Sequence, residues 1–253
     1  MLEVRALECA YGRIPALKGV DLEVRAGELV ALVGGNGAGK TTLLRALSGV
    51  LRSRGRVLFD GADLSEAPPE ARVAAGIVQV PEGRQVFGPL SVEDNLRLGA
   101  YRRGRASAAR TLERVYAMFP ALAERRCRTE AMQLLELVGL ERWADAASDA
   151  MPYGALKRLE IARALAAQPK LLLLDEPAAG LNPTETREID RLIRELASRG
   201  ITIVLVEHNM KLVMGVCGHV IVLEEGRKLA EGEPRTVSAD PRVIEAYLGE
   251  EAH

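Results

Sequence analysis

The stretch Leu29–Thr42 reads L-V-A-L-V-G-G-N-G-A-G-K-T-T, an apolar run followed directly by glycines, a lysine and two threonines. From Gly34 onward it fits G-x-x-x-x-G-K-[ST], a pattern typical of the loop that wraps nucleotide phosphates. Glycines let backbone N–H groups approach phosphate oxygens without a Cβ in the way, and the helix that follows presents its positive end to the same anion. The alternative is a glycine-rich turn that happens to precede a lysine. The apolar run before the loop and the helical spacing of residues 43, 44 and 47 after it favour the phosphate loop.

The residue types in this loop predict a task for each group. We expect Lys40 to supply a point charge to the β- and γ-phosphates of a nucleotide triphosphate, and Thr41 to offer its hydroxyl to Mg²⁺. The predicted nucleotide-binding residues of the loop are Gly34, Gly35, Asn36, Gly37, Ala38, Gly39, Lys40 and Thr41.

Composition narrows the class of protein. The chain has 253 residues, 48% of them hydrophobic, with a net charge of −1, so no general nucleic-acid-binding surface is expected. No apolar stretch approaches the roughly 18 residues of a membrane span, and no signal-peptide pattern opens the chain. The three cysteines, Cys9, Cys127 and Cys217, are far apart and indicate reduced thiols. A cytoplasmic protein is predicted, and any membrane span must come from another chain.

The order of apolar patterns predicts an α/β fold. Short alternating runs in residues 1–33 indicate an antiparallel β subdomain, and buried strands alternate with helices afterwards, which indicates a parallel sheet. Residues 90–155 read as an inserted α-helical subdomain, in which Ser91 begins a helix. Residues 1–89 and 156–253 then form the nucleotide-binding core, with a helix predicted over 156–167.

Titratable residues stand where two predicted strands end. Leu171–Leu174 is followed by Asp175 and Glu176, at the carboxyl edge where parallel sheets place their ligands. We expect Asp175 to hold Mg²⁺ through water and Glu176 to orient or deprotonate the attacking water. His208 follows a second apolar run and is expected to hydrogen bond to the γ-phosphate. The alternatives are two acids that only cap a strand and an ordinary surface histidine.

Taken in order, these motifs resemble the ATP-binding cassette ATPases of membrane transporters, across essentially the whole chain. Besides Gly34–Thr42, Leu171–Glu176 and His208, the resemblance includes a loop at Pro81-Glu82 and the segment Pro152-Tyr153-Gly154 before a helix. It implies a P-loop core, two chains that sandwich two ATP molecules, and transmembrane permease subunits as partners at the cytoplasmic face of the membrane. The second ATPase subunit is expected to be a copy of this chain or a sister.

The resemblance also implies further site residues. Tyr11 matches the aromatic residue that stacks on adenine, with a simple turn tyrosine as the alternative, and Thr42 matches a contact to the α-phosphate. Pro152, Tyr153 and Gly154 would contact ATP held by the opposing subunit. Glu82 stands where the family usually has glutamine and is expected to sense Mg²⁺; the alternative is a solvated loop acid.

A finer resemblance is to importers of branched-chain and other hydrophobic amino acids, which also use an extracytoplasmic solute-binding protein. The N-terminal half is similar to one of their two sister ATPases and the C-terminal half to the other, with a change-over near Arg126–Glu130. Besides Glu82, further positions depart from the family pattern. Where the family usually reads L-S-G-G-Q, Met151–Ala155 keeps only Gly154, with Pro152 in place of serine and Ala155 in place of glutamine, and Asn182 replaces an aspartate. The predicted function is the Mg²⁺-dependent ATPase subunit of such an importer. The alternatives are an ATPase of another transporter of this class, such as a urea importer or an exporter, and an ATP-gated dimerising module with weak hydrolysis.

Overall fold

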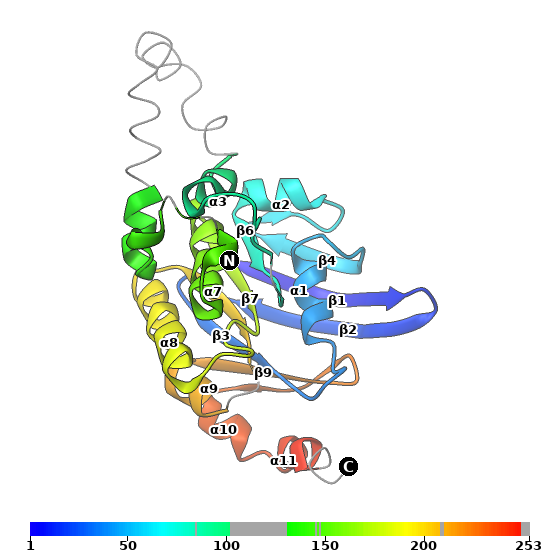
Figure 1. Ribbon diagram of the computed structural model, residues 1–253. Coiled ribbons are helices and arrows are strands. Elements are labelled where there is room, and N and C mark those ends of the chain that lie inside the picture. Colours follow the sequence, from blue (N-terminus) through cyan, green and yellow to red (C-terminus); the bar gives the residue numbers. More distant parts are fainter. Residues whose placement is uncertain (84, 102–130, 145, 147, 208–209, 249–253) are drawn as a thin grey trace. The chain divides into compact units, whose positions relative to one another are not determined.

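The computed structural model describes residues 1–83, 85–101, 131–144, 146, 148–207 and 210–248, and the chain forms two compact units (Figure 1). The first unit comprises Met1–Glu82, Lys170–Pro177 and Ile193–His253, and the second comprises Gly83–Pro169 and Ala178–Leu192. The predicted helical insertion, 90–155, lies within the range of the second unit, and its bounds stay a prediction.

A six-stranded sheet forms the centre of the first unit, in the order β10-β9-β3-β8-β7-β6. All neighbouring strands are parallel except β9 and β10, so the predicted parallel sheet is confirmed. Every residue of β3, β7 and β8 is buried, which explains their unbroken apolar runs. The strands are β3 (Leu29–Val33), β6 (Ile77–Val80), β7 (Leu171–Asp175), β8 (Thr202–Val206), β9 (His219–Glu224) and β10 (Arg227–Gly232).

A second, antiparallel sheet has the order β2-β1-β4-β5 and also belongs to the first unit. It consists of β1 (Leu2–Tyr11), β2 (Ile14–Val24), β4 (Arg54–Phe59) and β5 (Ala62–Asp63). Buried and exposed residues alternate along much of β2, as expected for a strand with one face on the core. The predicted N-terminal antiparallel subdomain is therefore confirmed.

The helices of the first unit are α1 (Lys40–Leu47), α2 (Pro69–Ala75), α9 (Met210–Val216), α10 (Pro234–Ser238) and α11 (Pro241–Leu248). The three leucines of α1 are fully buried in one hydrophobic cluster with residues of both sheets. Arg72 of α2 is 2% exposed and donates hydrogen bonds to the carbonyl oxygens of Ala46 (2.8 Å) and Leu47 (2.9 Å). This buried guanidinium thus satisfies the last carbonyls of the helix that follows the phosphate loop.

The second unit is helical. It contains α3 (Val92–Gly99), helical residues 131–138, the 3₁₀ turns Glu141–Trp143 and Ser148–Ala150, α7 (Tyr153–Ala166), and α8 (Pro183–Ser198) as far as Leu192. The hydroxyl of Ser91 accepts a hydrogen bond from the backbone N–H of Asp94 (3.1 Å), which confirms the predicted helix start. The prediction that the next helix begins at residue 156 is wrong. Pro152 already has the extended backbone of an N-cap, so α7 begins at Tyr153.

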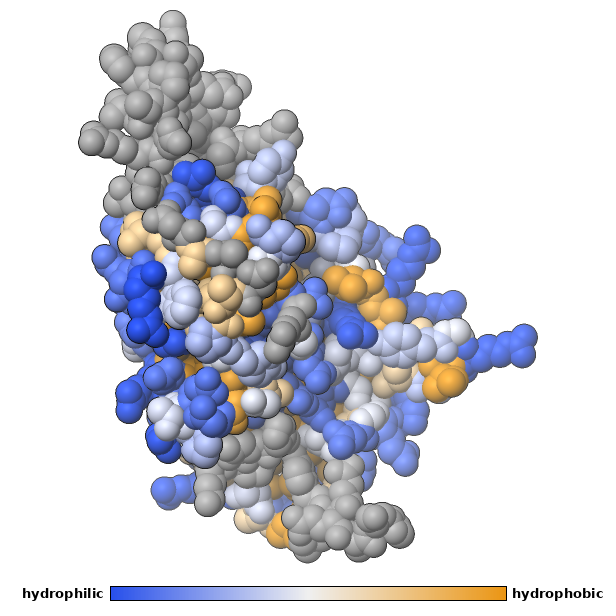
Figure 2. All heavy atoms as spheres, in the orientation of Figure 1, coloured by the Kyte–Doolittle hydropathy of each residue, from blue (hydrophilic) through white to orange (hydrophobic). Residues whose placement is uncertain are grey.

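Hydrophilic side chains cover most of the face seen in Figure 2, where hydrophobic ones form small separate groups. Among the helices of the described residues, none combines the length and apolar character that a membrane span requires.

Candidate functional site

The phosphate loop connects the end of β3 to the start of α1, and its shape depends on glycine. Gly34 has φ 150°, and a Cβ there would lie 2.2 Å from the carbonyl oxygen of Leu223. Gly39 has φ 104° and forms the N-cap of α1. No larger residue fits Gly34 without moving backbone atoms, so the loop pattern follows from steric constraints.

The loop is held from outside by the turn between β9 and β10. The N–H of Gly226 in that turn donates to the carbonyl oxygen of Ala38 (3.0 Å), and the carbonyl of Gly226 accepts from the N–H of Lys18 (2.8 Å). Asn36 and Gly37, at the tip of the loop, are exposed. A loop that is held by hydrogen bonds at its base and exposed at its tip is suited to binding an anion from solvent.

Lys40 lies inside the curve of this loop. Its side chain donates hydrogen bonds from Nζ to the carbonyl oxygens of Gly34 (2.7 Å) and Gly35 (2.8 Å), and the residue is only 7% exposed. The loop therefore holds a positive charge against its own backbone, where a phosphate would meet it.

The structure brings Thr41 and Asp175 together from motifs 134 residues apart. The hydroxyl of Thr41 donates to Oδ1 of Asp175 over 3.1 Å. Asp175 ends β7 and is 1% exposed, and among the described residues nothing hydrogen bonds to its Oδ2. Burial raises the pKa of this carboxyl, the Thr41 hydrogen bond partly opposes the rise, and the negative charges of Glu176 and Glu82 add to it. A buried carboxylate with an unused oxygen fits a nearby cation.

Glu176 follows Asp175 at a sharp turn of the main chain. Its φ is 47°, in the left-handed region that costs a non-glycine residue about 1–3 kcal/mol. Its N–H donates to the carbonyl oxygen of Val206 (3.1 Å), which fixes the turn against β8. The side chain is half-buried. Strained backbone of this kind is found at functional residues, where the surrounding structure, here the sheet, holds the residue in its strained conformation.

The Pro152–Gly154 segment lies at the start of α7, in the second unit. The Tyr153 hydroxyl donates to the carbonyl oxygen of Ala179 (3.3 Å). A Cβ on Gly154 would lie 2.5 Å from Oε1 of Glu185, so a larger residue here would require the Glu185 side chain to move.

The other predicted site residues have less defined surroundings. Tyr11 ends β1 and is 45% exposed, Glu82 is exposed just after β6, and Thr42 is 8% exposed in α1. His208 lies outside the described residues, as does the predicted change-over at Arg126–Glu130. In the described part of the chain, no group of three or more histidine, cysteine, aspartate or glutamate side chains is arranged to hold a metal ion.

The sequence reasoning missed two buried charged residues of α7, Lys157 and Glu160. Each is 3% exposed, and they form an ion pair of 3.3 Å. A signal was present, because α7 reads Y-G-A-L-K-R-L-E-I-A-R-A-L-A and has too many apolar positions to leave an exposed face for every charge.

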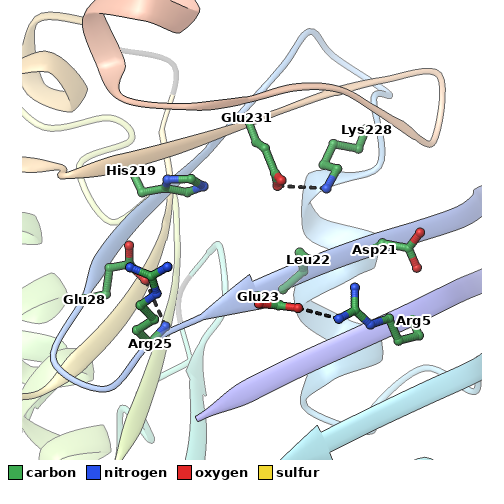
Figure 3. A pocket seen from close by; sticks show the side chains of 9 residues that line it. All are labelled: Arg5, Asp21, Leu22, Glu23, Arg25, Glu28, His219, Lys228 and Glu231. Atoms are coloured by element: carbon green, nitrogen blue, oxygen red, sulfur yellow. Dashed lines mark hydrogen bonds and ion pairs between the residues drawn. The ribbon is translucent and has the colours of Figure 1, made fainter.

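A separate pocket of the first unit is lined by charged side chains of both signs (Figure 3). Arg5 pairs with Glu23, and Lys228 pairs with Glu231 over 2.8 Å, so much of its charge is compensated within the lining. None of the predicted site residues lines it. The lining residues are Arg5, Asp21, Leu22, Glu23, Arg25, Glu28, His219, Lys228 and Glu231.

Comparison with known families and sequences gives matches over nearly the whole chain. Residues 17–179 match the family described as ABC transporter, and residues 227–253 match the family described as Branched-chain amino acid ATP-binding cassette transporter. The chain is 36% identical to the high-affinity branched-chain amino acid transport ATP-binding protein BraF of Pseudomonas aeruginosa and 38% identical to LivG of Escherichia coli, which carries the same description. Each alignment covers 99% of this chain and 98% of the relative. The lipopolysaccharide export system ATP-binding protein LptB of Acidithiobacillus ferridurans is 34% identical with the same coverage.

Comparison with solved structures also gives ATP-binding cassettes. A nucleotide-free ATP-binding cassette from an ABC transporter is 28% identical with a TM-score of 0.81, and the ADP conformation of the cassette MJ1267 is 29% identical with a TM-score of 0.82. Each covers 98% of both chains. Since a family match extends over more than half of the chain and several relatives exceed 30% identity from end to end, the chain belongs to the ABC transporter family, among its ATP-binding cassettes.

Proposed function

We propose that this chain is the Mg²⁺-dependent ATPase subunit of an importer for branched-chain amino acids. The contact between Thr41 and Asp175 carries the proposal, because it joins the phosphate loop to the end of β7 and leaves one buried carboxylate oxygen to which no described residue hydrogen bonds. The match of residues 227–253 and the names of the full-length relatives support the choice of solute.

The residues fit ATP and Mg²⁺. Lys40 would exchange its two carbonyl partners for the β- and γ-phosphates, and the N-terminus of α1 and the loop N–H groups would bind the same oxygens. Thr41 and Asp175 would hold Mg²⁺, Asp175 through water. When bound, Mg²⁺ would neutralise charge on the phosphates. Its charge would also oppose the burial and, to a lesser degree, the negative charges of Glu176 and Glu82 that raise the pKa of Asp175.

Glu176 is the proposed general base. It would orient a water molecule whose oxygen attacks the γ-phosphorus, and it would take the proton while the bond to the bridging oxygen of ADP breaks. His208 would donate a hydrogen bond to the γ-phosphate, Glu82 would sense the metal, and Tyr11 would stack on adenine. Thr42 would contact the α-phosphate.

The proposed assembly contains two ATPase subunits, transmembrane permease subunits at the cytoplasmic face of the membrane and, indirectly, an extracytoplasmic solute-binding protein. Pro152, Tyr153 and Gly154 would reach the ATP of the opposing subunit. One of the solved structures similar in fold is a dimeric cassette bound to ADP and phosphate, which supports pairing as a general arrangement.

Two experiments test the proposal. The purified full chain should release phosphate from ATP only when Mg²⁺ is present, and Glu176→Gln should bind ATP with near-normal affinity but turn it over at least ~100-fold more slowly. Equal rates for the two proteins would remove Glu176 from its role. Cells that lack the gene should lose uptake of labelled leucine, isoleucine and valine, and the wild-type gene but not the variant should restore it. Normal uptake in those cells would favour another solute or an export system.

A further inference from the structure

The glycine of the turn between β9 and β10 binds two other segments of the first unit through its main chain. Glu225 and Gly226 form this two-residue turn, and both have positive φ (45° and 78°), as the tightest turns of β-hairpins require. The N–H of Gly226 donates to the carbonyl oxygen of Ala38 in the phosphate loop (3.0 Å), and its carbonyl oxygen accepts from the N–H of Lys18 in β2 (2.8 Å). Both polar groups of this residue thus bind outside the hairpin.

No side chain fits on Gly226 unless backbone atoms move. A Cβ there would lie 2.4 Å from the carbonyl oxygen of Ala16 in β2. A Cβ on Gly39 of the phosphate loop would lie 3.0 Å from the same oxygen and 3.6 Å from the Cα atom of Gly226. The turn, the phosphate loop and β2 therefore pack backbone against backbone, and a side chain on Gly226 would push the turn away from the other two.

The phosphate loop meets the same hairpin at a second point. A Cβ on Gly34, where the loop begins, would lie 2.2 Å from the carbonyl oxygen of Leu223 in β9. The hydrogen bond from Gly226 to Ala38 lies near the other end of the loop. Since the hairpin contacts the loop at both ends, it constrains the orientation of the loop as well as its position.

The contact at Ala38 also sets the direction of one peptide group. The peptide between Ala38 and Gly39 is trans, so its carbonyl and its N–H point in opposite directions. The carbonyl of Ala38 points to the turn, outside the loop, and the N–H of Gly39 therefore points away from the turn, into the curve that holds Lys40. A phosphate bound in this curve would meet an N–H donor and a lysine together.

We propose that Gly226 is a positioning residue for the phosphate loop. Its N–H holds the peptide between Ala38 and Gly39 with the donor turned inward, so that the loop is shaped for phosphate before a nucleotide binds. This inference rests on the proposed function, in which the loop binds the phosphates of ATP. It adds a residue of the β9–β10 turn that acts on the nucleotide only through the loop.

A second turn of the same kind in the first unit supplies a matched control. Asp60 and Gly61 connect β4 to β5 with φ values of 50° and 82°, and a Cβ on Gly61 would meet no atom within 4 Å. Gly226→Ala and Gly61→Ala therefore place alanine at nearly the same left-handed backbone conformation. Only Gly226→Ala also forces a turn away from Ala16 and Ala38, so the comparison separates the effect on the phosphate loop from the strain of the turn itself.

The readouts are the affinities of the full chain for Mg-ATP and for Mg-tripolyphosphate by calorimetry, and the thermal midpoint without ligand. We expect Gly226→Ala to weaken binding of both ligands by the same factor, about 10-fold or more, because the lost preorganisation concerns the phosphates alone. Gly61→Ala should bind both ligands within about 2-fold of wild type. Equal affinities of the two variants, or a loss for ATP without a loss for tripolyphosphate, would overturn the proposal, whereas a purely structural role would lower the midpoint and leave affinity unchanged.

An ester substitution tests the hydrogen bond without adding a side chain. The chain can be joined from two segments at Cys217, with an ester oxygen in place of the nitrogen of Gly226, and then refolded. Compared with the same joined chain that carries the natural amide, the ester should weaken binding of both ligands about 3- to 10-fold, because the donor to Ala38 is gone. Unchanged affinity would refute the role of this N–H. If wild type binds neither ligand, it is the proposed function that fails, and if wild type binds both but hydrolyses no ATP, only the catalytic part of that function fails.

Discussion

Replacing Asp175 with asparagine is expected to stabilise the nucleotide-free protein and to abolish the proposed Mg²⁺-dependent ATP turnover. The carboxylate is 1% exposed, its Oδ1 accepts from Thr41 (3.1 Å), and its Oδ2 has no hydrogen-bond partner among the described residues. Asparagine can keep the acceptor for Thr41 and carries no charge. The charge that suits Asp175 to binding a cation is therefore expected to lower the stability of the nucleotide-free protein.

The magnitude follows from the cost of burying an unsatisfied group. That cost is about 1–3 kcal/mol for a polar atom and more for a charged one. Because the amide of the variant leaves a smaller penalty in place, the net gain should be about 1–2 kcal/mol. A gain of 1 kcal/mol raises the midpoint of a protein of this size by about 2–4 °C, so a rise of about 2–8 °C is expected.

The sign of the pH dependence is fixed by the direction of the pKa shift. Burial raises the pKa of Asp175 in the folded chain above its ordinary value. The stability contributed by this group is therefore present at low pH and is lost as pH rises through the folded-state pKa. The advantage of Asp175→Asn should be largest at mildly alkaline pH and should narrow as the pH is lowered.

Thermal unfolding in EDTA, followed by circular dichroism at several pH values, measures this advantage. Addition of Mg-ATP at 100 times its dissociation constant should stabilise wild type by about 2.7 kcal/mol and the variant by much less. Asp63→Asn is the control, because Asp63 is exposed and its pKa is lowered by hydrogen bonds from Ser65. It should not raise the midpoint. An Asp175→Asn midpoint at or below that of wild type in EDTA would refute the reasoning.

Three further perturbations test the surroundings of the site. Arg72→Met should lower the free energy of unfolding by about 1–3 kcal/mol in urea titrations, because the buried carbonyl oxygen of Leu47 loses its Arg72 donor and that of Ala46 keeps only the N–H of Gly49; an unchanged urea midpoint would contradict the capping role. Gly34→Ala should abolish ATP binding in equilibrium dialysis, since its Cβ would meet a backbone oxygen at 2.2 Å. In Gly37→Ala the added Cβ would meet no atom within 4 Å, so this variant should lose only about 1–2 kcal/mol of the free energy of ATP binding. Equal losses of ATP affinity in the two variants would contradict the steric argument. Burial raises the pKa of Cys217 to about 12, so this thiol should resist alkylation until the protein unfolds, as mass spectrometry of labelled peptides would show.

The phosphate loop and the parallel sheet could be predicted because local sequence already carries their physical cause. Five consecutive buried residues in β3 require five apolar side chains, and Gly34 has no room for a Cβ. The atom that leaves no room at Gly34 is the carbonyl oxygen of Leu223, which is distant in the sequence, but the glycine-rich pattern is recognisable without it. The same holds for Ser91, whose side chain caps a helix within three residues.

The composition of α7 indicates that some of its charges are buried, but the partners of those charges could not be predicted, because they come from a distant loop. Lys157 and Glu160 stand three residues apart, as ion pairs on exposed helix faces commonly do. What decides their burial is the backbone of Gly83 and Gln85, which lie 74 and 75 residues earlier in the sequence. Sequence spacing within a helix carries no record of such a partner.

The structure shows why asparagine fits at position 182, where the family pattern has an aspartate. The side chain of Asn182 accepts from the N–H groups of Thr184 (2.9 Å) and Glu185 (3.0 Å), while the Glu185 carboxylate accepts from the N–H of Asn182 (3.1 Å). This reciprocal capping serves the start of α8 with an amide as well as it would with a carboxylate. The absence of charge at Asn182 is thus compatible with the same local fold.

These observations assign α7 a common task in the second unit. Its first residue, Tyr153, holds the carbonyl of Ala179, three residues after Glu176, and its buried pair holds the loop that begins directly after Glu82. Both loops leave strands whose ends carry the proposed catalytic and metal-sensing acids. A helix that only filled space would be expected to present apolar side chains to them, since buried ions are costly. Matched hydrogen bonds to main-chain groups make the cost understandable, because they fix where the backbone of these loops of the second unit lies, whatever side chains the loops carry.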